Sequence, residues 1–357
     1  MSFCQLGIVH CASLPPLLSQ EGIMRRYIIA CIITIVAGTA LWAQAPRIGV
    51  FVPGAREGSP IYDNLAKGAE RLASEIPGAS VRVIEAGFNQ AEWEEKLTSF
   101  VASGKFDIVI TSNPSMPELV NNISKSFPKQ KFICLDGYLS GNPNVYSALY
   151  NQLEQGYVSG YLSGLVSISG MKGTNPDKKI GMIIGQNYPV MDKMIIPGFA
   201  QGLKAVDSAF QLDVRVLGNW YDAAKTADLS RSLYAGGADI ILPICGSASQ
   251  GSVKVAQETG KYLVFFDDDE FARAPENILG CAVLHQEELA YRSLKAALEG
   301  TLPFGKADVV GMKEGYIEFL NKNPSYIRNV PESIRKKVDA VIQSIKSGQL
   351  TFQVPSL

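Results

Sequence analysis

An internal duplication of strand and helix patterns constrains this 357-residue chain more than any other feature of its sequence. Short apolar runs alternate with helical patterns, which indicates parallel sheets in an α/β fold. The order of the first half recurs in the second: residues 81–83 (VRV) return as 214–216 (VRV), and the run that leads to Asp136 returns as one that leads to Asp267. Two copies of one sheet unit predict two doubly wound lobes of similar topology.

Ten short apolar runs are predicted strands, five in each half. The first set spans residues 47–52, 80–86, 106–111, 131–136 and 145–150, and the second spans 179–184, 213–217, 238–244, 262–267 and 278–284. In an open parallel sheet, ligands bind beyond the carboxyl ends of the strands. Because two facing lobes bring those ends to one cleft, the residues that follow each strand are the candidates for a binding site.

No long polar linker separates the two halves, so we expect the lobes to share hinge segments. We predict a first lobe of residues 46–152 together with about 268–305. The second lobe is predicted to contain residues 153–267 together with about 306–357.

The first 45 residues are interpreted as a signal or targeting segment. Arg25 and Arg26 precede an apolar run, residues 27–42, and the small-residue sequence 43–45 follows it, which is typical of a secretory signal peptide. The run is shorter than the roughly 20 apolar residues that a spanning helix needs. We expect an exported, periplasmic protein, and we leave open whether Met24 is the true start and whether Cys31 carries a lipid that tethers the protein to the cytoplasmic membrane.

Charge and residue usage argue against several classes of function. The formal net charge is −1 and no basic stripe is present, which argues against a nucleic-acid partner. His10 lies in the targeting segment, so the remaining chain has one histidine and cannot build a multi-histidine metal or catalytic centre. The sequence has no phosphate-binding loop, zinc-protease motif or nucleophile elbow. Cys134, Cys245 and Cys281 lie in or beside predicted strands and are interpreted as buried thiols.

Two polar features leave alternatives open. Asp267, Asp268 and Asp269 form an acidic run that would suit a divalent cation. A solvated loop, or one carboxylate that accepts hydrogen bonds from ligand hydroxyls, is the interpretation that we favour. His285 follows a predicted strand and would form an acid–base pair with Asp267 in an enzyme. No motif places a nucleophile beside it, so we favour a ligand contact or a structural role, and we expect neither an enzyme nor a metal site.

Aromatic residues at strand ends point to a ligand with planar rings. Trp220 lies in a polar turn after the strand 213–217, and Phe88 holds the duplicate position in the first half. Tyr62 lies where the loop after the first strand enters its helix. Aromatic faces offer large apolar area and stack on planar rings. We therefore predict that Trp220 faces the cleft, whereas Trp93, on a predicted helix, is interpreted as core.

Several motifs resemble those of the basic-membrane-protein family, which comprises substrate-binding proteins of ABC transporters. The likeness covers nearly all of the chain beyond the targeting segment, from a motif at 127–132 (FPKQKF) onward. The other motifs are 173–181 (GTNPDKKIG), 198–205 (GFAQGLKA), 311–315 (GMKEG), 330–332 (VPE), 345–349 (IKSGQ) and 354–355 (VP). The resemblance implies the type I periplasmic-binding-protein fold, in which two lobes joined by three crossovers close around a small ligand.

The resemblance also implies roles for individual residues. In the purine nucleoside receptors of this family, an aromatic residue at the position of Trp220 stacks on the base, and an aspartate at the position of Asp267 binds the ribose. The opposing aromatic residue lies in a motif that is broken here, and Tyr62 substitutes for it by position and chemistry. The ribose-binding lysine of those receptors corresponds to His285. The tryptophan and the missing lysine make the chain more similar to the riboflavin-binding branch.

We therefore expect a non-catalytic receptor that binds riboflavin as its transported ligand and needs no cofactor. A purine nucleoside is the alternative ligand. A flavin-dependent enzyme is the less favoured alternative function. The lesser contacts are predicted at strand ends and helix starts: Gln152, Glu154, Gln186, Tyr188, Gln250 and Asp136. The partners that the resemblance implies are a separate permease and ATPase, and the receptor itself is expected to be a monomer.

Overall fold

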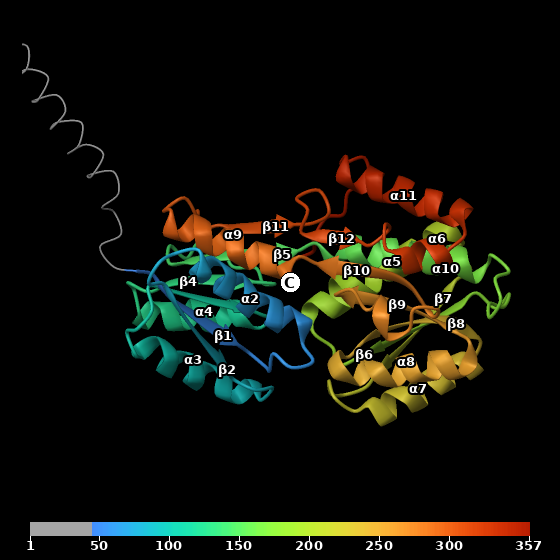
Figure 1. The fold of residues 1–357 in the computed structure, drawn as a ribbon, viewed down its shortest axis with the longest axis horizontal. Coiled ribbons are helices and arrows are strands. Elements are labelled where there is room, and N and C mark those ends of the chain that lie inside the picture. Colours follow the sequence, from blue (N-terminus) through green and yellow to red (C-terminus); the bar gives the residue numbers. More distant parts are fainter. Residues whose placement is uncertain (1–44) are drawn as a thin grey trace, which may run out of the picture. The chain divides into compact units, whose positions relative to one another are not determined.

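Two six-stranded sheets organise residues 45–357, the part of the chain that the computed structural model describes (Figure 1). The predicted targeting segment, including Met24 and Cys31, lies outside the described residues. The first sheet contains β1 (Arg47–Val52), β2 (Ser80–Glu85), β3 (Ile108–Ser112), β4 (Lys131–Leu135), β5 (Val145–Tyr150) and β11 (Ala307–Val310). The second contains β6 (Lys179–Ile184), β7 (Gln211–Val216), β8 (Ala238–Ile244), β9 (Tyr262–Asp267), β10 (Ile278–Leu284) and β12 (Ile317–Phe319).

The two sheets repeat one topology, which confirms the α/β prediction of two duplicated lobes. The strand orders are β11-β5-β4-β3-β1-β2 and β12-β10-β9-β8-β6-β7. In each sheet, the five strands from one half of the chain are parallel. The two sheets differ only in the sixth strand, because β11 pairs with β5 in parallel whereas β12 pairs with β10 antiparallel. This arrangement brings the carboxyl ends of five strands to one edge of each sheet.

Buried side chains of β1 alternate between the two faces of the first sheet, which explains how the sheet packs against helices on both faces. Ile48 and Val50 belong to one buried cluster with residues of α2, whereas Phe51 packs on the opposite face with residues of α3 and α4. Successive side chains of a strand point to opposite faces. A continuous apolar run is therefore what a doubly covered parallel sheet requires.

The helices cover both sheets (Figure 1). They are α2 (Pro60–Ser74), α3 (Trp93–Ala102), α4 (Met116–Ser126), α5 (Gln152–Ser167), α6 (Ile196–Val206), α7 (Ala223–Ala235), α8 (Gln250–Thr259), α9 (Gln286–Leu298), α10 (Pro324–Asn329) and α11 (Glu332–Lys346). No helix within residues 45–357 has both the length and the apolar composition that crossing a bilayer would require. Cys134, Cys245 and Cys281 are buried free thiols, as expected.

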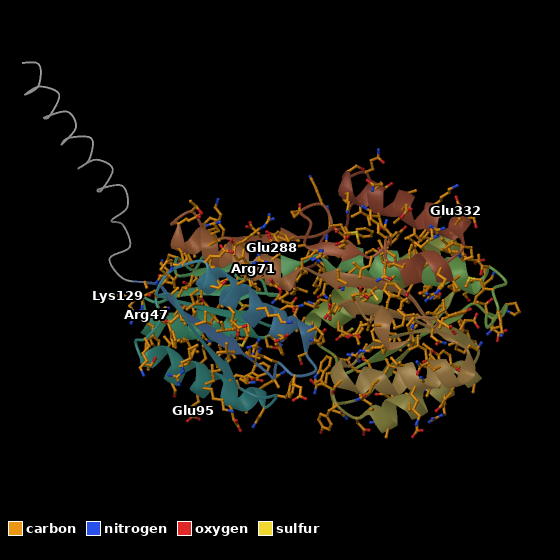
Figure 2. All side chains as sticks on the ribbon, in the orientation of Figure 1. Arg47, Arg71, Glu95, Lys129, Glu288 and Glu332 are labelled. Carbon is orange, nitrogen blue, oxygen red and sulfur yellow. The ribbon has the colours of Figure 1, made fainter. Side chains whose placement is uncertain are left out.

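Helix α9 returns to the first lobe and packs beside α2. The Arg71 guanidinium on α2 lies 2.9 Å from a carboxylate oxygen of Glu287 and 2.6 Å from one of Glu288, and Figure 2 shows Arg71 and Glu288 close together. A Cβ atom added to Gly68 would lie 2.5 Å from the backbone oxygen of Glu287, so only glycine permits this spacing. The two helices are thus held by close backbone approach and by charge.

The chain passes between the lobes at three places within the described residues. Asn151 joins β5 to α5, His285 joins β10 to α9, and residues 311–316 join β11 to β12. Asn151 lies beside the start of the third segment, because its backbone N–H donates at 2.8 Å to the carbonyl of Val310, the last residue of β11.

Two strands lie in the other lobe from the one predicted. Residues 278–284 were expected in the first lobe, but β10 pairs with β9 in the second sheet. Residues 307–310 were expected in the second lobe, but β11 pairs with β5 in the first. The connection from β9 to β10 holds only one short helical turn, Phe271–Arg273, and consecutive strands with short connections are usually neighbours. The boundary near residue 152 agrees with the crossover at Asn151.

Candidate functional site

A cavity of about 750 Å³ lies at the carboxyl ends of the strands, and residues of both lobes line it. The first lobe contributes the residues that follow β1, β2, β3 and β4, and the second contributes those that follow β6, β7 and β8, together with the end of β9. Binding sites for small organic molecules commonly have volumes of about 300–1,000 Å³. The duplication therefore brings equivalent loops of both halves to one cavity.

In the first lobe, Tyr62 forms part of the cavity wall. It is only 8% exposed, and its hydroxyl accepts a hydrogen bond from the Asn113 side chain at 2.8 Å. A Cβ atom on Gly54 would lie 2.6 Å from the Tyr62 ring and 3.0 Å from the ring of Phe88. Gly54 thus leaves the space that both rings occupy, and Phe88, half exposed, lines the cavity beside Tyr62.

In the second lobe, Trp220 lines the cavity after β7, as the sequence predicts. A Cβ atom on Gly185 would lie 2.5 Å from the six-membered ring of Trp220, so the indole rests directly on the backbone at the end of β6. The turn is held against the segment that follows β8, because the Trp220 carbonyl accepts hydrogen bonds from the Ala248 N–H and the Ser247 hydroxyl, each at 3.2 Å. Tyr188 lies beside it, with 6.5 Å between ring centres.

Two aspartates occupy equivalent positions at the ends of β4 and β9 and line the cavity from opposite lobes. Both Asp136 and Asp267 have left-handed backbones, with φ of 52° and 73°. Such conformations are uncommon outside glycine, though aspartate and asparagine adopt them more readily than other residues.

Burial raises the pKa of both carboxyls. The pKa of Asp136 rises to about 8 because its carboxyl is desolvated and the negative charge of Asp267 is near. The pKa of Asp267 rises to about 6, again through desolvation and with the charge of Asp268 adding, although a hydrogen bond from Gln155 opposes the rise. The Oδ1 atom of Asp136 is buried and has no hydrogen-bond partner among the described residues.

The first turn of α5 supports Asp267. The Gln155 side chain donates to the Asp267 carboxylate at 3.2 Å and to the Ala282 carbonyl at 2.8 Å. Gln152, which lines the cavity, donates to the Gln155 side-chain oxygen at 3.0 Å. Gln155 is fully buried, and the sequence did not predict it as a residue of the site. Its position three residues after Gln152, on the same helix face, was the available signal.

The charged groups around the cavity are mostly acidic. Asp136, Asp267, Glu57 and Glu270 line it, and Arg273 is the one basic side chain among the described residues of the wall. The Arg273 guanidinium forms an ion pair with Glu270. No unpaired cation therefore faces the cavity from the described part of the chain, and a phosphate group would meet negative charge there.

Three residues predicted to contact the ligand lie outside the cavity wall. His285 stands before α9, and its Nε2 lies 2.9 Å from the carboxylate of Glu318, so it contacts neither the cavity nor Asp267. Glu154 accepts a hydrogen bond from the Met312 backbone N–H at 2.8 Å and so ties α5 to the third crossover. Gln250, the first residue of α8, is exposed. Gln186 and Tyr188, in contrast, line the cavity after β6.

The acidic run after β9 does not gather around one point. Asp268 accepts a hydrogen bond from the Asp269 backbone N–H at 2.8 Å, and Asp269 accepts one from the Asn323 side chain at 3.0 Å. Within residues 45–357, no group of three or more acidic, histidine or cysteine side chains is arranged to hold a metal ion.

Solved structures of solute-binding proteins share this fold. An ABC transporter solute-binding protein from Aeropyrum pernix K1 superposes with a TM-score of 0.76 at 18% identity, over 87% of this chain and 94% of that one. One from Conexibacter woesei superposes with a TM-score of 0.66 at 21% identity, over 87% and 99%. At these identities the likeness establishes the fold alone.

Curated relatives share part of the sequence. The CD4+ T-cell-stimulating antigen of Listeria monocytogenes is 25% identical over 48% of this chain and 46% of that protein, and the basic membrane protein D of Borreliella burgdorferi is 27% identical over 57% and 58%. The chain thus spans about half the length of these relatives. A purine-binding protein of Brucella abortus is 28% identical over 73% of this chain and 69% of that protein.

The match to a protein family covers most of the chain. Residues 45–351 match the family described as "ABC transporter substrate-binding protein PnrA-like", which is a family of substrate-binding proteins and not of enzymes. The span contains both sheets and the cavity-lining residues of both lobes. The chain therefore belongs to the PnrA-like family of ABC transporter substrate-binding proteins.

Proposed function

We propose that this protein is the extracytoplasmic receptor of an ABC importer and binds riboflavin between its lobes. The observation that carries the choice of ligand is the Trp220 indole, which rests on Gly185 and faces a cavity of about 750 Å³. A two-ring indole offers a broad flat surface to a three-ring isoalloxazine. Aromatic pairs contribute about 0.5–1.5 kcal/mol beyond the burial of their area.

Aromatic side chains from the first lobe would cover the other face of the ring system. Tyr62 is held by Asn113, and Phe88 lies beside it over Gly54. The Tyr62 ring is 8% exposed, so Phe88, at 50%, offers more of its surface to a ligand. Closing the lobes on a ligand would bring these rings toward Trp220.

Polar groups would bind the ribityl chain and the ring edge. Asp267 is positioned by Gln155 to accept hydrogen bonds from hydroxyl groups, and hydrogen bonds to a carboxylate are about twice as strong as neutral ones. Gln152 and Gln186 supply further amide groups on the cavity wall. The acidic lining favours an uncharged ligand over its phosphate ester.

The receptor would act with separate subunits. Family membership supports a permease and an ATPase as partners, and the targeting segment predicted within residues 1–45 supports export to the periplasm. We propose a monomeric receptor that needs no cofactor of its own and releases riboflavin to the permease.

Fluorescence titration of the purified protein tests the choice of ligand. We expect riboflavin emission to be quenched on binding, and the 5′-phosphate to bind at least tenfold more weakly because Glu57, Asp136, Asp267 and Glu270 line the cavity. Unquenched riboflavin would refute the assignment. A strong preference for the phosphate, with turnover of an electron donor, would favour a flavin enzyme instead.

A purine nucleoside is the second candidate. The observation that favours it is the 28% identity with a Brucella abortus protein that is named as purine-binding. A purine could stack on Trp220, and ribose hydroxyls could donate to Asp267. Titration with guanosine and adenosine in the same buffer decides between the candidates: nucleoside binding without riboflavin binding would establish this alternative.

A further inference from the structure

Gly58 of the first lobe lies very close to Ser247 of the second lobe. Gly58 is in the loop between β1 and α2, and its backbone is left-handed, with φ of 72°. A Cβ atom added to Gly58 would lie 3.2 Å from the Cβ atom of Ser247, in the segment that follows β8. Carbon atoms in ordinary contact lie about 3.5–4.0 Å apart. The space between the lobes is therefore narrower here than an alanine side chain requires.

This approach lies away from the segments that join the lobes. The three crossovers attach to β5 and β11 of the first sheet and to β10 and β12 of the second. Three strand spacings separate β1 from β5 and two separate β8 from β10, which corresponds to about 14 Å and about 10 Å. When two lobes rotate about their crossovers, points far from the crossovers move most. Gly58 therefore approaches Ser247 only when the lobes are closed.

The loop that carries Gly58 is fixed to the aromatic wall of the first lobe. The Arg56 guanidinium lies 2.8 Å from a carboxylate oxygen of Asp63 on α2. The Ser59 carbonyl accepts a hydrogen bond from the Tyr62 backbone N–H at 3.0 Å. Because an ion pair and a backbone hydrogen bond hold this loop on the first turn of α2, Gly58 keeps a fixed position relative to Tyr62.

The segment that carries Ser247 is fixed to the aromatic wall of the second lobe. The Trp220 carbonyl accepts hydrogen bonds from the Ser247 hydroxyl and the Ala248 N–H, each at 3.2 Å. A Cβ atom added to Gly246 would lie 3.0 Å from the same carbonyl oxygen, so the segment packs closely on the Trp220 turn. Since each partner of the approach is attached to one aromatic wall, the distance between the partners sets the gap between the walls.

We propose that the contact between Gly58 and Ser247 is a closure stop, which ends the rotation of the lobes and sets the width of the slot beside Trp220. A flat ring system between two side chains needs a slot about 7 Å wide, which is two contacts of about 3.5 Å. The missing side chain at Gly58 lets the aromatic walls close to such a width. The inference rests on the proposed function, because it assigns the limit of closure to a receptor that captures a planar ligand.

Gly87 provides a control position with the same backbone. It lies in the loop after β2 of the first lobe and also has φ of 72°. Among the described residues, nothing lies within 4 Å of a Cβ atom added there. Alanine is strained to the same degree at both positions, because the strain of a left-handed residue depends on its own backbone. Only at Gly58 does the added methyl group meet the other lobe.

Riboflavin titration and dissociation kinetics of Gly58→Ala and Gly87→Ala test the closure stop. We expect Gly58→Ala to bind about tenfold more weakly than Gly87→Ala, because overpacking at the contact keeps the lobes apart in the bound state. The loss should arise chiefly from faster dissociation, since changes within one interface act mostly on that rate. The melting temperatures of the two ligand-free variants should be similar. Equal affinities, or tighter binding by Gly58→Ala, would overturn the proposal.

An engineered disulfide tests the contact without reference to the ligand. The Cβ atoms of a disulfide lie about 3.5–4.5 Å apart, so cysteines at residues 58 and 247 are close enough to bond when the lobes are closed. Oxidised glutathione is added to Gly58→Cys/Ser247→Cys and to the control Gly87→Cys/Ser247→Cys, with and without riboflavin. We expect peptide mass mapping to find the new disulfide in the first variant alone, and riboflavin to accelerate its formation.

The ligand-free crosslink separates this proposal from the proposed function. If neither riboflavin nor guanosine binds, the proposed function fails, and a disulfide in ligand-free Gly58→Cys/Ser247→Cys but not in its control still supports the contact. A disulfide that forms in neither the presence nor the absence of ligand overturns the closure stop, and so does one whose formation the bound ligand slows. If guanosine binds and riboflavin does not, the same measurements are made with guanosine.

Discussion

At the residue scale, two glycines determine where aromatic rings can lie in the cleft. Gly54 and Gly185 follow the first strand of each half, and in both cases an added Cβ atom would enter a ring that lines the cavity. The rings are Tyr62 and Phe88 in one lobe and Trp220 in the other. The duplication thus preserved the space for a ring while the ring-bearing residues diverged.

Replacing the two tryptophans tests this picture. Trp220→Ala is expected to weaken riboflavin binding about thirtyfold or more, because a buried aromatic anchor can contribute 2 kcal/mol or more to binding. Its melting temperature should change little, since Trp220 lies in a turn and cleft substitutions usually cost under about 0.5 kcal/mol. Titration and thermal melting of the same preparations provide the measurement.

Trp93→Ala is the comparison, and we expect its main effect to be a loss of stability. Trp93 is 3% exposed, belongs to the buried cluster on α3 and α4, and donates its indole N–H to the Gly87 carbonyl at 2.7 Å, as a core residue would. It also lines the cavity, which its interpretation as core did not include. Truncating a buried tryptophan costs about 3–5 kcal/mol of stability. A Trp220→Ala protein that binds normally and melts far below the wild type would show that the cleft assignment is wrong.

At the element scale, helices α5 and α6 approach each other through glycine. A Cβ atom on Gly160 would lie 2.1 Å from the Phe199 carbonyl oxygen, and one on Gly202 would lie 2.1 Å from the Tyr157 carbonyl oxygen. Both obstacles are backbone atoms, which cannot move aside without separating the helices. Helix α5 begins at the first crossover and carries Gln155, whose side chain donates a hydrogen bond to Asp267. The packing of α5 on α6 therefore also positions this hydrogen bond.

Alanine at Gly160 should therefore destabilise the second lobe. We expect Gly160→Ala to lower the free energy of unfolding by about 2 kcal/mol or more, since overpacking typically costs about 1–3 kcal/mol. Gly164→Ala, one turn along the same helix, is the control, because its Cβ atom would meet side-chain atoms of Val206 at 3.1 Å. Chemical denaturation measures both; equal stability of the two variants would contradict the proposed backbone contact.

At the scale of the whole molecule, one hydrophobic core joins the two lobes. A single buried cluster includes Ile48 and Val50 of the first sheet and Ile180 and Met182 of the second. The cluster lies away from the α3 and α4 face of the first sheet, whose residues form a separate core. The two strand-end aspartates of the cleft have raised pKa values in the folded protein, so their ionisation is linked to the stability of folding.

The ligand-free protein should lose stability as the pH rises from about 4 to about 8. The pKa of Asp136 is about 8 and that of Asp267 about 6 in the folded protein, against 3.8 in an unperturbed aspartate. A raised pKa means that the folded state binds the proton more tightly, so the stabilisation is complete below pH 4 and is lost as the pH rises through the folded pKa.

Thermal melts between pH 4.5 and 9 measure this dependence. We expect the melting temperature of the wild type to fall across the range, and that of Asp136→Asn to fall less because the asparagine stays neutral. Parallel curves for the two proteins would contradict a raised pKa at Asp136. A melting temperature that rises steadily toward pH 8 would do so as well.

Sequence by itself determined the repeated architecture and much of the cleft. The periodicity and apolar character of a segment are local properties of the sequence, so the ten main strands were predicted to within about two residues. The positions that follow the strands pointed to Trp220, Tyr62, Gln186 and Tyr188 as cavity residues. The family resemblance, carried by motifs along the chain, also agreed with the comparisons.

Only the tertiary structure decided which strands are neighbours and which side chains turn inward. The lobe of β10 depended on its pairing with β9, and hydrogen bonds across a sheet leave no local mark on the sequence. His285 follows a strand, as Asp136 does, yet its ring turns to Glu318, because Glu318 on β12 becomes its neighbour only after folding. The unpartnered Oδ1 of Asp136 belongs to the same class, since a missing partner is defined by everything that packs around the atom.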